Sequence, residues 1–196
     1  MSTTSKTTPL WLDRALLFGR NFFKHPKMLG SLIPSSRFLV NRLLQQIDWE
    51  AAEVIVEYGP GVGVFTTEIL RRMRPNATLV AIETNADFVD FLRRSVHDSR
   101  LQVVHGSAAD IAGILSELGL TQADYIISGI PYSTMPPQVR DAILSASRMV
   151  LSSKGRFLVY QFSRVARPFL QREFRRVKPD FEPLNIPPAS LFYCTP

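Results

Sequence analysis

The sequence has one cysteine, Cys194, which excludes an internal disulfide and favours a reducing, cytoplasmic setting. Its three histidines, His25, His97 and His105, are scattered, so we expect no metal site. No apolar run approaches the ~20 residues that a membrane-spanning helix needs. Charged residues interrupt the apolar stretch near the N-terminus, unlike in a signal peptide. We therefore expect a globular protein without disulfide, metal or membrane span.

The composition suits one domain with a full core, because 45% of the 196 residues are hydrophobic and 20% are charged. The net charge of +6 is concentrated at the two ends. Residues 1–42 carry seven basic side chains and one acidic one, and residues 164–196 carry six basic and three acidic ones. Residues 43–163 carry ten basic and thirteen acidic ones. This distribution predicts an anionic partner, either a lipid surface or a nucleic acid.

The most informative stretch is residues 53–63, Glu-Val-Ile-Val-Glu-Tyr-Gly-Pro-Gly-Val-Gly. An apolar run, a glycine turn and an apolar-periodic segment predict a strand, a turn and a helix, the opening unit of a nucleotide-binding α/β domain. The spacing is not the G-x-G-x-x-G of dinucleotide-binding proteins. The glycines allow a sharp turn and a close approach of a ligand to the main chain.

Two acidic residues narrow the choice of ligand. Glu57 ends the first predicted strand and can accept a hydrogen bond from an ammonium group. Glu83 ends the second strand, where such folds place a carboxylate on ribose hydroxyls. A ligand with a ribose, an amine and no pyrophosphate fits, and S-adenosylmethionine is one. At this point the sequence resembles class I methyltransferases; the alternative is a doubly wound fold that binds another nucleoside. The predicted cofactor-binding residues are Glu57, Tyr58, Gly59, Gly61, Gly63, Glu83, Thr84, Ser107, Ala108 and Ser128.

The remaining chain alternates between predicted strands and helices. We expect strands at 54–58, 78–82, 101–104, 125–128 and 156–162, helices at 37–46, 85–92, 109–118, 136–151 and 165–176, and a hairpin of segments 177–184 and 189–194. The fold class is therefore α/β and Rossmann-like, with a mainly parallel seven-stranded sheet and helices on both faces. Residues 1–48 are assigned to an N-terminal helical extension, and residues 49–196 to the catalytic domain.

The extension begins with a predicted amphipathic helix at residues 9–25. Aromatic residues on one side and basic residues on the other are typical of an interfacial membrane helix. The alternative is a helix that packs on the domain's own core. Residues 27–36 form a loop that caps the next helix and can also act as a lid. The predicted membrane contacts are Trp11, Phe18, Phe22, Arg14, Arg20 and Lys24.

Residues 128–132, Ser-Gly-Ile-Pro-Tyr, resemble the Asn-x-Pro-Tyr/Phe motif of amino-methyltransferases such as the ribosomal RNA adenine dimethylases. The resemblance implies catalytic roles for Ser128, Gly129 and Tyr132, which would hold the target nitrogen and stack on the substrate. The alternative is a proline turn with a packed tyrosine. Gly129 stands where the dimethylases have Asn, and Ser107 stands where they have Asp. We also expect no helical RNA-binding domain after the hairpin.

Bacterial phospholipid N-methyltransferases, which are related to those dimethylases, resemble the chain more fully. The resemblance rests on the loop 25–37, the glycine turn, Ser-Gly-Ile-Pro-Tyr and Tyr-Gln-Phe-Ser at 160–163. It implies stepwise methylation of phosphatidylethanolamine toward phosphatidylcholine. It also implies a cytoplasmic enzyme that is docked on the inner face of the membrane by its N-terminal helix, with no nucleic acid as partner.

Cations for the lipid phosphate and aromatic walls for the amine are the expected substrate contacts. The predicted substrate-binding residues are Ser35, Ser36, Arg37, Tyr132, Tyr160, Arg164 and Arg167; the arginines can equally be ordinary surface residues. Two other functions stay open. One is methylation of ribosomal RNA adenine or of a small amine, and the other is a membrane-binding role without catalysis.

Overall fold

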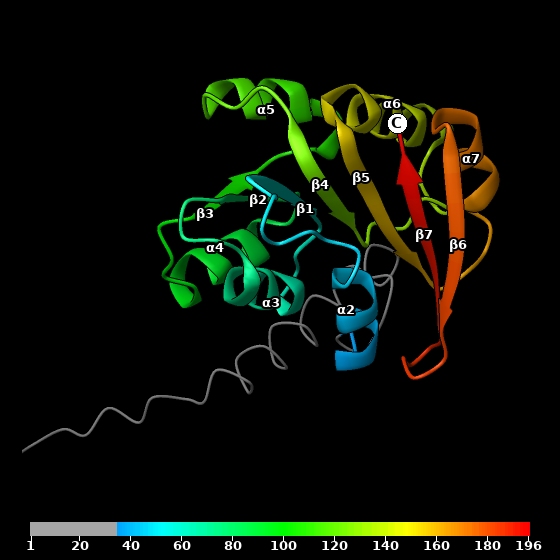
Figure 1. Cartoon of the computed structure of the whole chain (residues 1–196), viewed down its shortest axis with the longest axis horizontal. Coiled ribbons are helices and arrows are strands. Elements are labelled where there is room, and N and C mark those ends of the chain that lie inside the picture. The colour runs from blue at the N-terminus through cyan, green and yellow to red at the C-terminus, as the bar shows by residue number, and fades with distance from the viewer. Residues whose placement is uncertain (1–34) are drawn as a thin grey trace, which may run out of the picture.

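The computed structural model describes residues 35–196, which form one seven-stranded sheet with helices on both sides (Figure 1). The strands are β1 Val54–Tyr58, β2 Thr78–Glu83, β3 Leu101–His105, β4 Ala123–Ser128, β5 Leu151–Gln161, β6 Arg176–Glu182 and β7 Ala189–Thr195. The helices are α2 Arg37–Leu44, α3 Val64–Arg72, α4 Ala86–Ser95, α5 Ile111–Glu117, α6 Pro137–Val150 and α7 Arg167–Glu173, with a 3-10 turn at Ala108–Asp110.

The strand order is β3-β2-β1-β4-β5-β7-β6. The first five strands are mutually parallel, and β7 is antiparallel to both β5 and β6. The carboxyl ends of β1, β2 and β4 therefore meet at one edge of the sheet. The mainly parallel sheet, the α/β class and the C-terminal hairpin at the sheet edge are confirmed.

Successive side chains of the central strands point to opposite faces of the sheet and pack into two hydrophobic cores, one on each face. Val56 of β1 faces the side covered by α5, α6 and α7, and its neighbour Ile55 faces the side covered by α2 and α3. Strands buried on both faces read as continuous apolar runs, and this is why Val54–Val56 and Ile126–Ile127 stood out in the sequence. Helices on both faces of the sheet are thus confirmed (Figure 1).

Among the predicted boundaries that differ from the structure are those of β5 and α7. The strand predicted to start at residue 156 begins at Leu151, because Leu151 already pairs with Ala123 before the register shifts and Arg156 pairs with Tyr125. The basic helix predicted over 165–176 is only Arg167–Glu173, since Phe174 is extended and leads directly into β6.

The helix predicted at 37–46 is α2, which ends at Leu44. The Ser36 side chain caps it by accepting a hydrogen bond from the Leu39 backbone N–H at 3.2 Å, as expected for one of the two serines. Leu39 and Leu43 are fully buried in the same core as β1. The described part of the predicted extension thus packs as part of the domain, while a division at residue 48 stays a prediction.

Candidate active site

The turn between β1 and α3 is built from glycines in the left-handed region. Gly59, Gly61 and Gly63 have φ of 67°, 55° and 76°, a conformation that side-chain-bearing residues rarely adopt. A Cβ on Gly63 would approach a methyl group of Leu92 to 2.7 Å, so helix α4 also packs tightly against this turn. A Cβ on Gly61 would meet nothing within 4 Å. Open space therefore faces the middle of the turn.

Two buried carboxylates flank this turn. Glu83, at the end of β2, accepts hydrogen bonds from the backbone N–H of Gly61 at 3.2 Å and of Asn85 at 2.9 Å. Glu57, at the penultimate position of β1, accepts one from the Thr66 hydroxyl at 2.7 Å. Because a carboxylate offers about four lone-pair sites, Glu57 keeps capacity for a ligand beside its contact with Thr66.

Burial sets the protonation of these carboxylates. It raises the pKa of Glu57 to about 7, although the Thr66 hydrogen bond opposes the shift. Burial also raises the pKa of Glu83. A bound ammonium group beside Glu57 would favour its ionised form. This site therefore suits a ligand that brings its own positive charge.

Not every predicted cofactor residue presents its side chain here. The Tyr58 side chain lies in the core, with its hydroxyl 3.0 Å from that of Ser147. The Ser107 hydroxyl caps the 3-10 turn by accepting from the Ala109 N–H at 3.2 Å, and Ala108 is buried. Thr84 is exposed and contributes hydrogen bonds to Glu83. Any contact of Tyr58 with a cofactor would have to come from its backbone.

At the end of β4, the Tyr132 side chain does not lie where a ring that stacks on the substrate was expected. Tyr132 is only 1% exposed, and its hydroxyl is 2.8 Å from the hydroxyl of the fully buried Ser128. Its ring packs edge-on against Phe157 in the core on the α6 side. This is the packed tyrosine of the alternative interpretation. A stacking role of Tyr132 on the substrate is not supported by this position and stays a prediction.

Tyr160, from β5, lies instead against the backbone at Gly129. A Cβ on Gly129 would collide with the Tyr160 hydroxyl, so the phenol fills the space in which a side chain at position 129 would stand. The Tyr160 ring stacks on Phe65 with centroids 5.1 Å apart and meets Phe162 edge-on at 6.5 Å. The Ser35 side chain hydrogen-bonds the phenol, and burial raises the pKa of Tyr160 to about 12.

Sequence reasoning missed two supporting residues. Thr66 holds Glu57, and the buried Gln161 donates from its side-chain amide to the Ile130 carbonyl at 2.8 Å. The Gln161 contact ties the end of β5 to the Gly-Ile-Pro turn after β4. Thr66 follows the glycine turn and Gln161 lies within Tyr-Gln-Phe-Ser, but no pattern of residue types marked either contact in advance.

The predicted substrate arginines fall into two places. Arg164 and Arg167 line one pocket of about 320 Å³ with Phe181 and Ser190 at the edge formed by β6 and β7. Arg37 is exposed at the start of α2, where its guanidinium lies 4.9 Å from the centre of the Phe38 ring. Asp180, which is paired with Arg42, also lines this pocket. The site thus has a pocket with two arginines and one acid at the hairpin, and a separate cation on α2.

The predicted membrane contacts Trp11, Phe18, Phe22, Arg14, Arg20 and Lys24 lie outside the described residues. Within residues 35–196, no helix is long and apolar enough to cross a membrane. The same residues hold no cluster of His, Cys, Asp and Glu that could bind a metal ion.

The fold and the glycine turn with its two carboxylates define the class: the protein is a methyltransferase that uses S-adenosylmethionine. When bound, this cofactor supplies an electrophilic methyl group on a sulfonium. The chain belongs to the ribosomal RNA adenine dimethylase family, whose family model matches residues 22–151. The predicted relation to those dimethylases is confirmed.

Two relatives illustrate the range of the family. The chain is 35% identical over 180 residues to an ornithine lipid N-methyltransferase from Singulisphaera acidiphila, covering 91% of this chain and 94% of that protein. It is 31% identical over 113 residues to ribosomal RNA small subunit methyltransferase A from Mycoplasma mycoides, covering 56% of this chain and 40% of that protein. The lipid enzyme thus matches nearly end to end, whereas the RNA enzyme matches over less than half its own length.

Solved structures support the fold. A methyltransferase from Geobacter sulfurreducens superposes with a TM-score of 0.63 at 16% identity, over 97% of this chain and 92% of that one. Human methyltransferase-like protein 13 in complex with SAH superposes with a TM-score of 0.59 at 15% identity, over 81% and 79% of the two chains. The Rossmann-like methyltransferase fold expected from the sequence is confirmed.

Proposed function

We propose that this methyltransferase acts on the primary amine of a membrane lipid, with phosphatidylethanolamine as the substrate and methylation proceeding stepwise toward phosphatidylcholine at the membrane surface. The observation that carries the lipid assignment is the match, over 91% of this chain, to an enzyme named for N-methylation of a lipid. Ornithine lipid is the second candidate, because it is the substrate named for that relative.

The two lipids share the chemistry that the site offers. Each carries a primary amine near an anionic group, a phosphate in one and a carboxylate in the other. Arg164 and Arg167 line one pocket, and a pair of guanidinium groups suits either anion. The pocket lies at the end of β6 and β7 that pairs with the carboxyl end of β5, since Ser190 pairs with both Gln161 and Phe181.

Tyr160 is the residue that we assign to the amine. Its hydroxyl lies against Gly129 and hydrogen-bonds Ser35, so an acceptor is held where β4 ends. With its pKa raised to about 12, the phenol stays neutral at pH 7 and can accept from an amine N–H. Methyl transfer needs the nitrogen lone pair, so the amine must first lose its proton; water can take this proton.

The space beside Gly129 argues against a nucleobase. The dimethylases carry an Asn side chain at this position, whereas here the Tyr160 hydroxyl fills the corresponding space. An aliphatic amine has no amide edge to be recognised and needs only a hydrogen-bond acceptor for its N–H and room to approach. Methylation of ribosomal RNA or of a small amine is therefore the alternative that the assay must exclude.

The test is transfer of labelled methyl groups from S-adenosylmethionine to four substrates offered separately. These are phosphatidylethanolamine and ornithine lipid in mixed micelles, a ribosomal RNA transcript, and free ethanolamine. Labelled lipid product supports the proposal and identifies the lipid. Product from RNA or ethanolamine alone, with both lipids unmodified, would overturn it.

A further inference from the structure

The turn between β6 and β7 exposes two large aliphatic side chains. Leu184 is 59% and Ile186 is 69% exposed, within the segment Pro-Leu-Asn-Ile-Pro-Pro at 183–188. The tips of surface loops are usually polar, because nothing there offsets the contact of apolar groups with water. We call residues 183–188 the hairpin turn.

Buried polar contacts hold this turn in place. Asn185 is 2% exposed; its side-chain oxygen accepts from the Ser36 N–H at 2.8 Å, and its amide donates to the Pro187 carbonyl at 2.8 Å. Glu182, 3% exposed, accepts from the Leu184 N–H at 2.8 Å. The polar groups of the turn are thus satisfied inside, and the aliphatic groups point outward.

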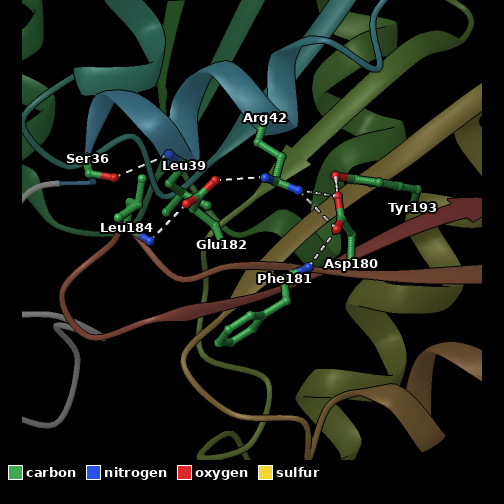
Figure 2. A network of polar contacts seen from close by, with 8 residues as sticks. All are labelled: Ser36, Leu39, Arg42, Asp180, Phe181, Glu182, Leu184 and Tyr193. Carbon is green, nitrogen blue, oxygen red and sulfur yellow. Dashed lines mark hydrogen bonds and ion pairs between the residues drawn. The ribbon is translucent and has the colours of Figure 1, made fainter.

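Figure 2 shows how the turn is fastened to α2. Arg42 bridges Glu182 at 2.7 Å and Asp180 at 3.3 Å, and Asp180 also accepts from the Tyr193 hydroxyl at 2.7 Å. The Phe181 ring points away from this network (Figure 2). The two acidic side chains of the hairpin are therefore both paired with Arg42, on the α2 side.

Arginines that form no ion pair within residues 35–196 flank the turn on two sides. Arg37 is exposed and adjoins Ser36, whose N–H bonds to Asn185. On the other side, the exposed Arg164 and Arg167 share a pocket with Phe181, which is itself 44% exposed. Exposed aliphatic groups between arginines, with the local acids already paired, complement an anionic bilayer.

The position of the turn agrees with a membrane contact near the active site. The hairpin turn, the carboxyl ends of β4 and β5 and helix α2 lie toward the same end of the molecule (Figure 1). The described chain also begins at this end, at Ser35, next to the Ser36–Asn185 contact.

We propose that the hairpin turn inserts Leu184 and Ile186 into the acyl region of an anionic bilayer while Arg37, Arg164 and Arg167 contact the headgroups. This inference rests on the proposed lipid substrate. Two projecting aliphatic residues are too few for a stable protein interface, which needs roughly 1,000 Å² of buried area. A bilayer accepts single apolar side chains without matching their shape.

Site-specific labelling tests the insertion. Cys194 is the single cysteine and is fully buried, so Ile186→Cys can carry an environment-sensitive fluorophore in the otherwise native chain. Met149, 72% exposed on α6, gives the matched control Met149→Cys. With vesicles containing phosphatidylglycerol, we expect a blue shift and quenching by brominated acyl chains at position 186 and neither at 149. A water-like spectrum at position 186 with vesicle-bound protein would overturn the proposal.

A loss-of-binding experiment gives a second, independent readout. Leu184→Asp with Ile186→Asp should weaken vesicle binding by roughly tenfold or more, whereas Met149→Asp should leave it unchanged. Equal binding by both variants would contradict the insertion. Wild-type methylation of a short-chain phosphatidylethanolamine in detergent, measured in parallel, tests the proposed function without a bilayer. A protein that methylates this lipid but shows no insertion refutes only the inference about the turn.

Discussion

The substitution Glu57→Gln separates the charge of the buried carboxylate from its shape. The glutamine oxygen can still accept a hydrogen bond from Thr66, but the side chain at this position, which is 3% exposed in the wild type, can no longer carry a negative charge. Burial raises the pKa of Glu57 from its ordinary value of 4.5 to about 7 in the fold. The folded protein therefore holds this proton over a pH range in which the unfolded chain has released it.

The sign of the effect follows from these two values. Well below pH 4.5 the carboxyl is protonated in both states and does not affect stability through its charge. Between pH 4.5 and 7 the wild type loses stability as pH rises, and above 7 the loss is constant. At 1.36 kcal/mol per pKa unit, the full loss is about 3 kcal/mol. The variant escapes this loss, so its stability relative to wild type should rise by about 2 to 3 kcal/mol between pH 5 and 8.

Urea unfolding at several pH values, without cofactor, measures the difference. Any packing effect of the amide is independent of pH and cancels in the comparison. The exposed residue Glu50 supplies the control Glu50→Gln, for which we expect changes within about 0.5 kcal/mol. A flat difference between Glu57→Gln and wild type from pH 5 to 8 would refute the reasoning. Calorimetry should show weaker S-adenosylmethionine binding by the variant, roughly 10- to 100-fold, from the lost charge-assisted hydrogen bond.

Three further predictions concern the substrate side. Gly129→Ala should lower activity at least about tenfold, because its methyl collides with Tyr160, whereas Gly113→Ala, whose methyl meets nothing within 4 Å, should be as active as wild type in the methyl-transfer assay. Tyr160→Phe should keep the stacking on Phe65 but lose the acceptor, lowering kcat by roughly 10- to 100-fold at unchanged cofactor affinity. Arg164→Ala with Arg167→Ala should raise KM for the lipid by roughly tenfold.

Each of these predictions has an outcome that counts against it. Equal activity of Gly129→Ala and Gly113→Ala would show that Tyr160 can move away from the added methyl group without loss of activity. A wild-type kcat in Tyr160→Phe would show that the Tyr160 hydroxyl has no role in the reaction. If the double arginine variant loses activity on free ethanolamine as strongly as on lipid, the arginines do not bind the anionic group of the lipid.

The architecture was predictable because it depends on local patterns. Buried parallel strands give continuous apolar runs such as Val54–Val56. The glycines at 59, 61 and 63 indicate a turn whose positive φ angles other residues rarely adopt. The acids at the ends of β1 and β2 followed from the same logic. The start of β5 was missed because residues 152–155 form an irregular segment without alternation.

The substrate side was less predictable because its contacts join distant residues. A Pro-Tyr pair is compatible with a ring on either side of the backbone, and only packing against Phe157 decides that Tyr132 turns inward. The collision between Gly129 and Tyr160 connects residues on β4 and β5 that no local pattern couples. The hairpin turn likewise depends on Asn185 meeting Ser36, from opposite ends of the described chain.

The strand order has a consequence for synthesis on the ribosome. β7, which leaves the ribosome after β6, lies between β5 and β6. Until residues 189–195 have emerged, β6 therefore has no neighbour in the sheet and β5 is paired only with β4. Until then the nascent chain exposes the open edge of β5, whose Phe157, Leu158 and Val159 are fully buried in the finished protein. Such an edge is prone to intermolecular pairing. We expect ribosome-bound chains that lack β7 to recruit chaperones, and emergence of residues 189–195 to complete the sheet.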